Sequence, residues 1–365
     1  IAAFTSNIFA AAPVILGKQT LANNKTSRAI IINSGNANAC TGEQGIKDAR
    51  RMCSLTAELL NIEQDEVLVS STGRIGTNLP MDIIEQGIGK AAKELSVNGG
   101  KNAADAIMTT DTKAKTAAVS LDIAGKNVTI GAMVKGAGMI APQMKMAVPQ
   151  ATMLAFFTTD ANISWDALQN SSKTCLENSF NKIIIDGDTS TNDSLFVMSS
   201  ALAENELIVK DSENCQKFSN ALRALMDYLA KEMVLDGEGV TRFIDLKITG
   251  AANDEDARKI AEAIARSPLC KTAWFGADPN WGRILAAAGY SGVEFNPEEV
   301  DLDYNSIPVV RKGKSAGTTE EILAETMQNK EVEICLKLGE GRGACSVWTC
   351  DLSYEYVKIN AEYTT

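Results

Sequence analysis

Alternating apolar and polar positions divide the chain into strand-like and helix-like segments. Short apolar runs such as Arg28–Asn33 (RAIIIN) and Glu66–Ser70 (EVLVS) predict buried strands. Apolar residues at helical spacing over 45–60 predict a helix. We expect further strands at 116–123, 128–134, after Thr152, 243–249, 331–338 and 344–350, and further helices at 80–95, 165–178 and 212–234. This alternation predicts an α+β protein with mixed β-sheets.

Local signals define several element boundaries. Pro80 is expected in the first turn of its helix, and Asn253 is expected to cap the helix that follows it. The sequence AGKN at 124–127 predicts a hairpin between the strands on either side. The closing run KINAEYTT is predicted to be β-like.

A chain of 365 residues is long enough for two domains. We expect a catalytic α/β core at 1–240, a smaller α/β domain at 241–350, and a tail at 351–365 that returns to the active site. The first residues, Ile1–Phe4, resemble the middle of a strand. An N-terminal segment is therefore expected upstream.

The net charge of -11 argues against nucleic-acid and anionic-membrane partners, which need clustered cations. No apolar run approaches the ~20 residues of a membrane span. The 8 cysteines form no CxxC pair and there are 0 histidines, so no metal site is expected. Reduced thiols in a cytoplasmic enzyme are the favoured interpretation, with disulfides as the alternative.

The lack of histidine excludes Ser-His and Cys-His pairs as the means of activating a nucleophile. At the start of a strand-like run, however, the small residue Ala151 precedes Thr152. A chain that cuts itself between these residues would free an N-terminal threonine. Its α-amino group, with an ordinary pKa of about 7.7–8.0, could take up the hydroxyl proton.

Glycine-containing loops supply further candidate residues. In SSTGRIG at 70–76, Thr72 and Gly73 could hold a developing oxyanion, although local sequence alone favours a simple glycine turn. In KGAGMIAP at 135–142, Lys135 is either a cation at the mouth of a site or a solvated side chain. In LDGEGVTR at 235–242, Glu238 could bind a substrate ammonium group or lie in a surface turn.

The acidic loop DGDTSTNDS at 186–194 departs from the spacing of a calcium-binding loop. We predict instead a loop rich in hydrogen bonds from side chains to the backbone.

Several strings occur together and in order: FTSNIFAAAPV, INSGNANACTG, STGRIG, IMTTDT, KGAGMIAP, ATMLAFFTTDA, SFNKIIIDGDTSTNDS, DGEG, FGADPNWGRI and NAEYTT. Through these strings, nearly the whole chain closely resembles the ornithine acetyltransferase / glutamate N-acetyltransferase family of arginine biosynthesis. The resemblance implies mixed β-sheets sandwiched between helices, similar to the autocatalytic aminopeptidase superfamily.

The resemblance also implies self-cleavage at Ala151-Thr152 and a heterotetramer of two α segments (1–151) and two β segments (152–365). It implies acetyl transfer from N2-acetylornithine to glutamate through an acetyl ester on Thr152, with Thr72 and Gly73 as the oxyanion hole. The exchange needs no metal, nucleotide or other cofactor. Substrate-binding positions carried over from the family are Thr112, Lys135, Thr152, Glu238, Asn360 and Thr365.

Three questions stay open at this point. The resemblance does not decide whether acetyl-CoA is also used as an acetyl donor. It also leaves three alternatives: a self-cleaving amidase or aminopeptidase, a non-enzymatic binding protein, and an uncleaved, inactive homologue. In addition, residues 143–150 stand where the family pattern has two or three residues, an insertion of roughly six. The insertion is either a surface bulge or a segment that changes how Lys135 approaches the site.

Overall fold

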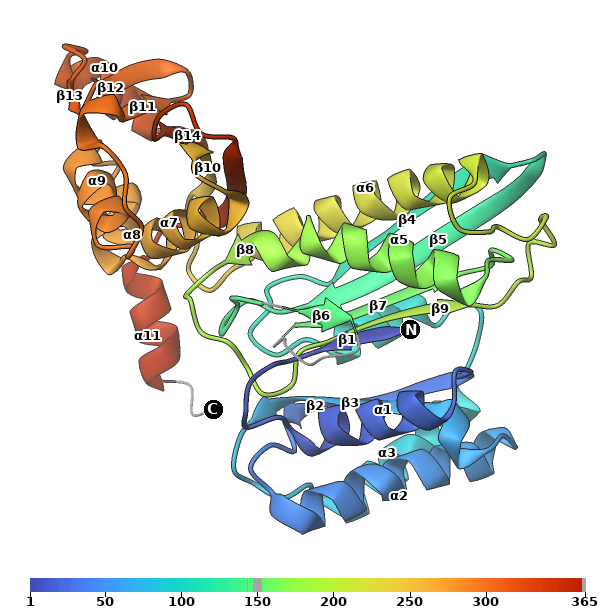
Figure 1. Cartoon of the computed structure of the whole chain (residues 1–365). Helices are drawn as coiled ribbons and strands as arrows, with labels where there is room; N and C mark the ends of the chain where they lie inside the picture. Colours follow the sequence, from blue (N-terminus) through green and yellow to red (C-terminus); the bar gives the residue numbers. More distant parts are fainter. Residues whose placement is uncertain (143, 147–152, 363–365) are drawn as a thin grey trace. The chain divides into compact units, whose positions relative to one another are not determined.

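The computed structural model describes residues 1–142, 144–146 and 153–362, without the side chains of residues 145 and 146 (Figure 1). The chain divides into two compact units. The first contains the described residues of Ile1–Asn181 and Asp188–Met233. The second contains Lys182–Gly187 and the described residues of Val234–Tyr363.

A six-stranded mixed sheet forms the centre of the first unit, in the order β4-β5-β7-β9-β1-β6. β7 and β9 are parallel, and the other neighbours are antiparallel. The strands are β1 (Ala2–Phe4), β4 (Lys115–Ile123), β5 (Lys126–Lys135), β6 (Lys145–Met146), β7 (Leu154–Thr159) and β9 (Ser194–Ser199).

A parallel pair of strands lies below this sheet in Figure 1, with α1 and α2 beneath it, while α5 and α6 cover the upper side. The prediction of mixed sheets between helices is therefore confirmed. The elements of these layers are α1 (Ala12–Asn23), β2 (Ala29–Asn36), α2 (Gly42–Leu60), η1 (Gln64–Glu66), β3 (Val67–Arg74), α3 (Met81–Lys93), α4 (Gly100–Ala106), α5 (Trp165–Glu177), η2 (Phe180–Lys182) and α6 (Glu213–Leu235).

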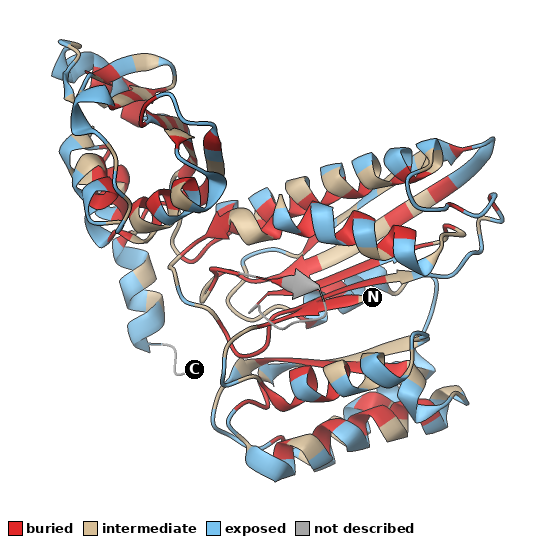
Figure 2. Ribbon diagram, viewed as in Figure 1, coloured by how far each residue is buried: buried red, intermediate tan, exposed pale blue. Residues whose placement is uncertain are grey.

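Aromatic and aliphatic side chains fill the space between the sheet and the strand pair. Phe4 and Phe156 both pack on Phe196, with ring centroids 5.5 and 5.7 Å apart, and Leu68 of β3 belongs to the same cluster. Figure 2 shows the buried colour concentrated along the strands and the exposed colour on the outer faces of the helices. This packing fixes β3, β5 and β7 relative to one another.

Two local predictions are confirmed. The hairpin joins β4 to β5 with Ile123 opposite Lys126, and Ala124 and Gly125 both have positive φ, as a tight turn of the primed type requires. Asn253 caps the following helix, since its Oδ1 accepts a hydrogen bond from the Asp256 amide at 2.9 Å.

The second unit is built on a seven-stranded sheet in the order β13-β12-β11-β14-β10-β15-β8. Its strands are β8 (Ile183–Ile184), β10 (Phe243–Ala251), β11 (Asp301–Tyr304), β12 (Ile307–Arg311), β13 (Lys314–Ser315), β14 (Glu331–Lys337) and β15 (Gly343–Cys350). Its helices are α7 (Asp254–Arg266), α8 (Pro268–Phe275), α9 (Trp281–Gly289), η3 (Pro297–Glu299), α10 (Glu320–Met327) and α11 (Tyr354–Glu362).

The prediction of a β-like C-terminal run is wrong for its described part, residues 358–362, which belongs to the helix α11 (Tyr354–Glu362). Ser353 accepts a hydrogen bond from the Tyr356 amide at 3.3 Å, in the manner of a helix N-cap. The Tyr354 ring packs edge-on against Phe275, with centroids 5.3 Å apart. Tertiary packing and capping therefore override the strand preference of Tyr, Val and Ile.

Part of the 143–150 insertion is ordered within the sheet. β6 pairs with β1, with Met146 opposite Ala3. The Asn181 side chain accepts from the Met144 amide and donates to its carbonyl, both at 2.6 Å. Residues 143 and 147–150 lie outside the described residues. Within the described chain, no helix has the length and apolarity needed to span a membrane.

Candidate functional site

The end of β3 carries the two predicted oxyanion-hole residues. Thr72 lies opposite Ser34, and Gly73 lies opposite Gly35, on the parallel strand β2. Gly73 has φ +125, and a Cβ there would lie 2.3 Å from the Gly35 carbonyl carbon. Only glycine fits this backbone position without displacing β2. The Thr72-Gly73 peptide is thus held in a conformation that a side chain at position 73 would disrupt.

Lys135, the last residue of β5, is buried rather than solvated. Its Nζ donates hydrogen bonds to the hydroxyl oxygens of Thr72 at 3.1 Å and Thr109 at 2.8 Å. It also lies 3.8 Å from a carboxylate oxygen of Asp111. In the backbone ladder Lys135 is paired with Leu154, the first residue of β7. The structure therefore joins Lys135, Thr72 and the beginning of β7 in one place.

Asp111 links this site to a second buried lysine. Its Oδ1 accepts hydrogen bonds from Lys115 Nζ and from the Gly136 amide, each at 2.7 Å. Burial raises the pKa of the Asp111 carboxyl, but Lys135, Lys115 and the Gly136 amide together lower it below its ordinary value. Asp111 is therefore an ionised carboxylate that acts as counter-charge to two buried ammonium groups.

Thr112, a predicted substrate-binding residue, directly follows Asp111 and is exposed. The structure thus brings four predicted site residues, Thr72, Gly73, Thr112 and Lys135, into one region of the first unit. With Asp111 ionised, its carboxylate faces the ammonium groups of Lys115 and Lys135. Fixed donors and positive charges of this kind stabilise developing oxyanions.

The loop 186–194 binds the backbone next to the site, as its hydrogen-bonding composition predicted. Asn192 Nδ2 donates to the carbonyl oxygens of Ala37 at 2.5 Å and Ser71 at 2.8 Å. The Asn192 amide in turn donates to Ser190 Oγ at 3.2 Å. This loop therefore fixes the strand at the residue before Thr72. Among the described residues no group of histidine, cysteine or acidic side chains is arranged to hold a metal ion.

The other two described candidates lie together in the second unit. Asn360 of α11 donates a hydrogen bond from Nδ2 to Glu238 Oε2 at 2.7 Å, and Glu238 is only 8% exposed. A Cβ on the next residue, Gly239, would lie 2.5 Å from Ser353 Oγ and 2.6 Å from the Tyr356 nitrogen. Glycine thus lets the loop approach α11 closely enough for this pair to form. Glu238 is not in an exposed surface turn.

Three predicted site residues, Ala151, Thr152 and Thr365, lie outside the described residues. Conversely, the structure adds Thr109, Asp111 and Lys115, which our sequence reasoning did not select. The string IMTTDT, quoted only as part of the resemblance, contains two of them. The sequence signal for these residues was a carboxylate, Asp111, that follows hydroxyl residues in a loop. Such a signal does not show that the carboxylate binds a lysine.

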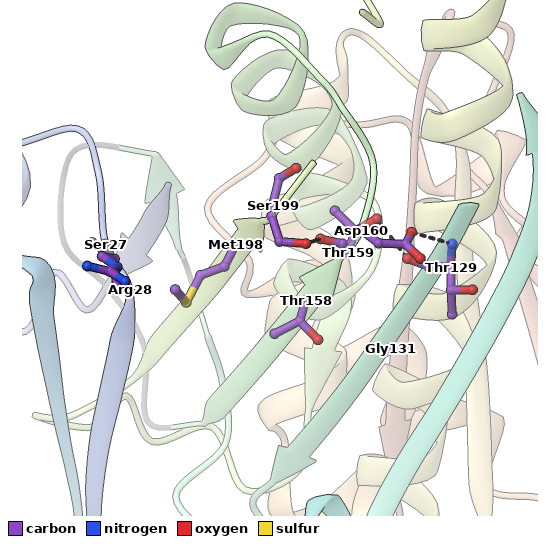
Figure 3. A pocket seen from close by; sticks show the side chains of 10 residues that line it. Ser27, Arg28, Thr129, Gly131, Thr158, Thr159, Asp160, Met198 and Ser199 are labelled. Carbon is purple, nitrogen blue, oxygen red and sulfur yellow. Dashed lines mark hydrogen bonds between the residues drawn. The ribbon is translucent and has the colours of Figure 1, made fainter. Parts of the chain in front are cut away.

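A separate polar pocket of about 670 Å³ opens at the other end of β7 (Figure 3). It is lined by Thr158 and Asp160, whereas the Lys135 site adjoins Leu154. About five residues of strand, roughly 17 Å, separate the two ends. The Asp160 carboxylate already accepts from the Thr129 amide at 2.7 Å, as drawn in Figure 3. This pocket contains none of the predicted site residues.

Similar known proteins identify the family of this chain. The model of the ArgJ family matches residues 1–365. Two curated relatives are similar to the chain over nearly its whole length. The arginine biosynthesis bifunctional protein ArgJ of Symbiobacterium thermophilum is 47% identical over 362 residues, which cover 99% of this chain and 88% of the relative. The glutamate N-acetyltransferase of Methanocaldococcus jannaschii is 47% identical over 378 residues, which cover 99% of this chain and 90% of the relative.

A solved structure gives the same result. The crystal structure of arginine biosynthesis bifunctional protein ArgJ from Bacillus halodurans is 44% identical, with a TM-score of 0.55. The match covers 57% of this chain and 98% of that chain. The resemblance seen in the sequence is thereby confirmed, and the chain belongs to the ArgJ family.

Proposed function

We propose that this chain transfers the acetyl group of N2-acetylornithine to glutamate, after cutting itself between Ala151 and Thr152. The family and the names of its relatives support an N-acetyltransferase of arginine biosynthesis. The observation that carries the proposal is the buried contact of Lys135 with Thr72 beside the beginning of β7. Thr152 is two residues before Leu154, the first residue of that strand.

The chemistry requires only groups that the chain provides. In self-cleavage, Thr152 Oγ attacks the carbonyl carbon of Ala151, the peptide nitrogen leaves, and water hydrolyses the resulting ester. In turnover, the same oxygen attacks the acetyl carbonyl while the freed α-amino group takes up the hydroxyl proton. That proton passes to the departing ornithine nitrogen, and an acetyl ester remains on Thr152. Glutamate then attacks the ester through its free amine.

The contact with Lys135 determines that the Thr72 oxygen accepts one hydrogen bond and that its proton can donate another. An ammonium group has three donors and no acceptor, so Thr72 Oγ must accept the 3.1 Å hydrogen bond. The Thr72 proton is then available to donate elsewhere. Together with the Gly73 amide it would stabilise the oxyanion that forms during attack on either carbonyl.

The two segments produced by the cut would stay associated through the sheet. β5 of the first segment pairs with β7 of the second from Ile130–Thr159 to Lys135–Leu154, and β1 pairs with β9. These ladders, with the aromatic cluster beside them, hold the segments together without a covalent link. We extend this to a heterotetramer with two copies of each segment, in the cytoplasm.

The charged candidates suit amino-acid substrates. The Lys135 ammonium group would attract a substrate carboxylate. The buried Glu238 carboxylate, held by Asn360, would bind a substrate ammonium group. Thr112, Thr152 and Thr365 complete the proposed substrate contacts.

Mass spectrometry after brief incubation with N2-acetylornithine tests the proposal. We expect two segments instead of one 38.9 kDa chain, and one added acetyl group on the C-terminal segment. Addition of glutamate should remove that acetyl group and give N-acetylglutamate. Loss of the acetyl group to water alone would indicate a hydrolase instead. Replacing the donor with acetyl-CoA shows whether the enzyme has one function or two.

Replacing Thr72 with valine should lower kcat for acetyl transfer by about 10²–10³, because one oxyanion donor is lost. Valine keeps the branched shape of threonine but removes the acceptor of the Lys135 hydrogen bond, so a lower melting temperature is expected as well. Thr72→Ser, which retains the hydroxyl, is the matched control and should recover most of the rate. Equal rates for the valine and serine variants would argue against a donor role for Thr72.

A further inference from the structure

Asp193, in the loop that precedes β9, is a buried acidic group with no assigned role. The residue is 1% exposed. Both of its carboxyl oxygens are buried and have no hydrogen-bond partner among the described residues. Buried polar groups in native proteins are nearly always paired, so an orphaned carboxyl calls for an explanation.

The backbone places Asp193 beside the beginning of β7. The amide of the next residue, Ser194, donates a hydrogen bond to the Met153 carbonyl at 2.8 Å, and Ser194 is paired with Leu154. Thr152 is joined to Met153 by one peptide bond. Covalent geometry limits the span from the Thr152 nitrogen to the Met153 carbonyl to about 7 Å. The described chain that follows Thr152 is therefore held against the backbone that carries Asp193.

The backbone beside Asp193 belongs to uncharged residues. The Asp193 carbonyl accepts a hydrogen bond from the Thr5 amide at 3.1 Å, and the next residue, Ser194, is paired with Phe4 and Leu154. The charged group that acts on the Asp193 carboxyl is Lys135. Lys135 in turn contacts Asp111, which also binds Lys115. Burial raises the pKa of the Asp193 carboxyl well above its ordinary value, and Lys135 offsets only part of this. In the uncut chain Asp193 thus favours its neutral form.

We propose that Asp193 is a positioning residue whose carboxyl group receives the α-amino group freed on Thr152, and that the two groups share one exchangeable proton. The inference rests on the proposed self-cleavage. Before the cut, a neutral acid is tolerated in the apolar surroundings. After the cut, the new amino group supplies the partner that the carboxyl lacks.

The proton balance is simple. When the amine forms, it takes the proton of the Asp193 acid and gives an ammonium-carboxylate pair. To act as a base, the ammonium returns this proton to the carboxylate, so that a neutral amine stands beside a neutral acid. The amine then takes the Thr152 hydroxyl proton as the C–O bond forms. A buried site makes the neutral pair accessible because separated charges are costly there.

The pH profile of kcat/KM for N2-acetylornithine tests the proposal. Asp193→Asn keeps the size of the side chain but removes the negative charge that favours the ammonium form. We expect the acidic limb of the kcat/KM profile of this variant to lie about 1–3 pH units lower than in wild type, with a reduced kcat. Asp193→Glu, which keeps the carboxyl, should have its limb near that of wild type. Asp160→Asn, at the far end of β7, is the matched control and should leave the limb unchanged.

Infrared spectra provide a second test if Asp193→Asn does not fold. The uncut Thr152→Ala variant should show the carbonyl band of a buried protonated carboxylic acid, and the cut wild-type protein should have lost most of it. Equal bands in both proteins, or an unshifted acidic limb with only a lowered melting temperature, would overturn the role of Asp193. A wild-type chain that stays uncut would instead overturn the proposed self-cleavage, so the two failures are distinguishable.

Discussion

Replacing Thr152 with alanine should leave the protein as one species of 38.9 kDa, without measurable acetyl transfer. The substitution removes the oxygen that attacks Ala151, so no cut occurs and no α-amino group is freed. Nucleophile and base are lost together, and the 0 histidines leave no imidazole to replace them. Denaturing mass spectrometry and an acetyl-exchange assay on the same sample measure both losses.

Two variants make this experiment specific. Thr152→Ser keeps a hydroxyl and should still be cut and show exchange, at reduced rates. Thr158→Ala changes an exposed threonine on the same strand and should behave as wild type. Wild-type exchange by the uncut Thr152→Ala chain would show that the nucleophile has been assigned incorrectly.

Replacing Asp111 with asparagine should destabilise the protein by about 3–5 kcal/mol. The carboxylate contacts Lys115 Nζ at 2.7 Å and Lys135 Nζ at 3.8 Å, and the Asp111 side chain is fully buried. Asparagine retains the size but not the charge, so both buried ammonium groups lose a counter-charge. Urea unfolding at neutral pH measures the loss.

The surface pair Arg51–Glu85 provides the control, because its atoms are 2.9 Å apart but both side chains are about 40% exposed. Glu85→Gln should lower the stability far less than Asp111→Asn, since solvent screens exposed pairs. A similar loss in both variants would mean that the buried cluster has no special contribution to stability.

The pH dependence of stability should follow the same carboxyl. The pKa of Asp111 is lowered in the folded protein, so its contribution is fully present above the unfolded value of about 3.9. That contribution is lost as pH falls through the lower folded value. Wild type should therefore lose more stability than Asp111→Asn on acidification.

Elements defined by local signals could be predicted from the sequence. The hairpin between β4 and β5 depends on a two-residue turn, and the α7 N-cap depends on the Asn253 side chain alone. In both cases residues next to one another in the chain determine the geometry. The family strings in turn identified Thr72, Gly73 and Lys135 as members of one site.

Features that depend on distant residues could not be predicted. Lys135 was open to interpretation as a solvated side chain because Thr72, which it contacts, lies 63 positions away. Asp193 was part of a loop predicted only to form hydrogen bonds from side chains to the backbone, and its burial arises from strands that are remote in sequence. The C-terminal helix depends on Phe275 packing against Tyr354, a contact that no local pattern encodes.

The short strand β8 (Ile183–Ile184) has a consequence for dividing this protein into parts. It pairs in parallel with β15, at Trp348 and Thr349, although the described residues up to Asn181 and those of Asp188–Met233 belong to the first unit. The chain thus enters the second unit, leaves it and enters it again. A truncation after residue 240 would strip β8 of its only neighbour in the described sheet and expose two isoleucines on an open edge, which favours aggregation. No single end truncation of the gene therefore separates the two units cleanly.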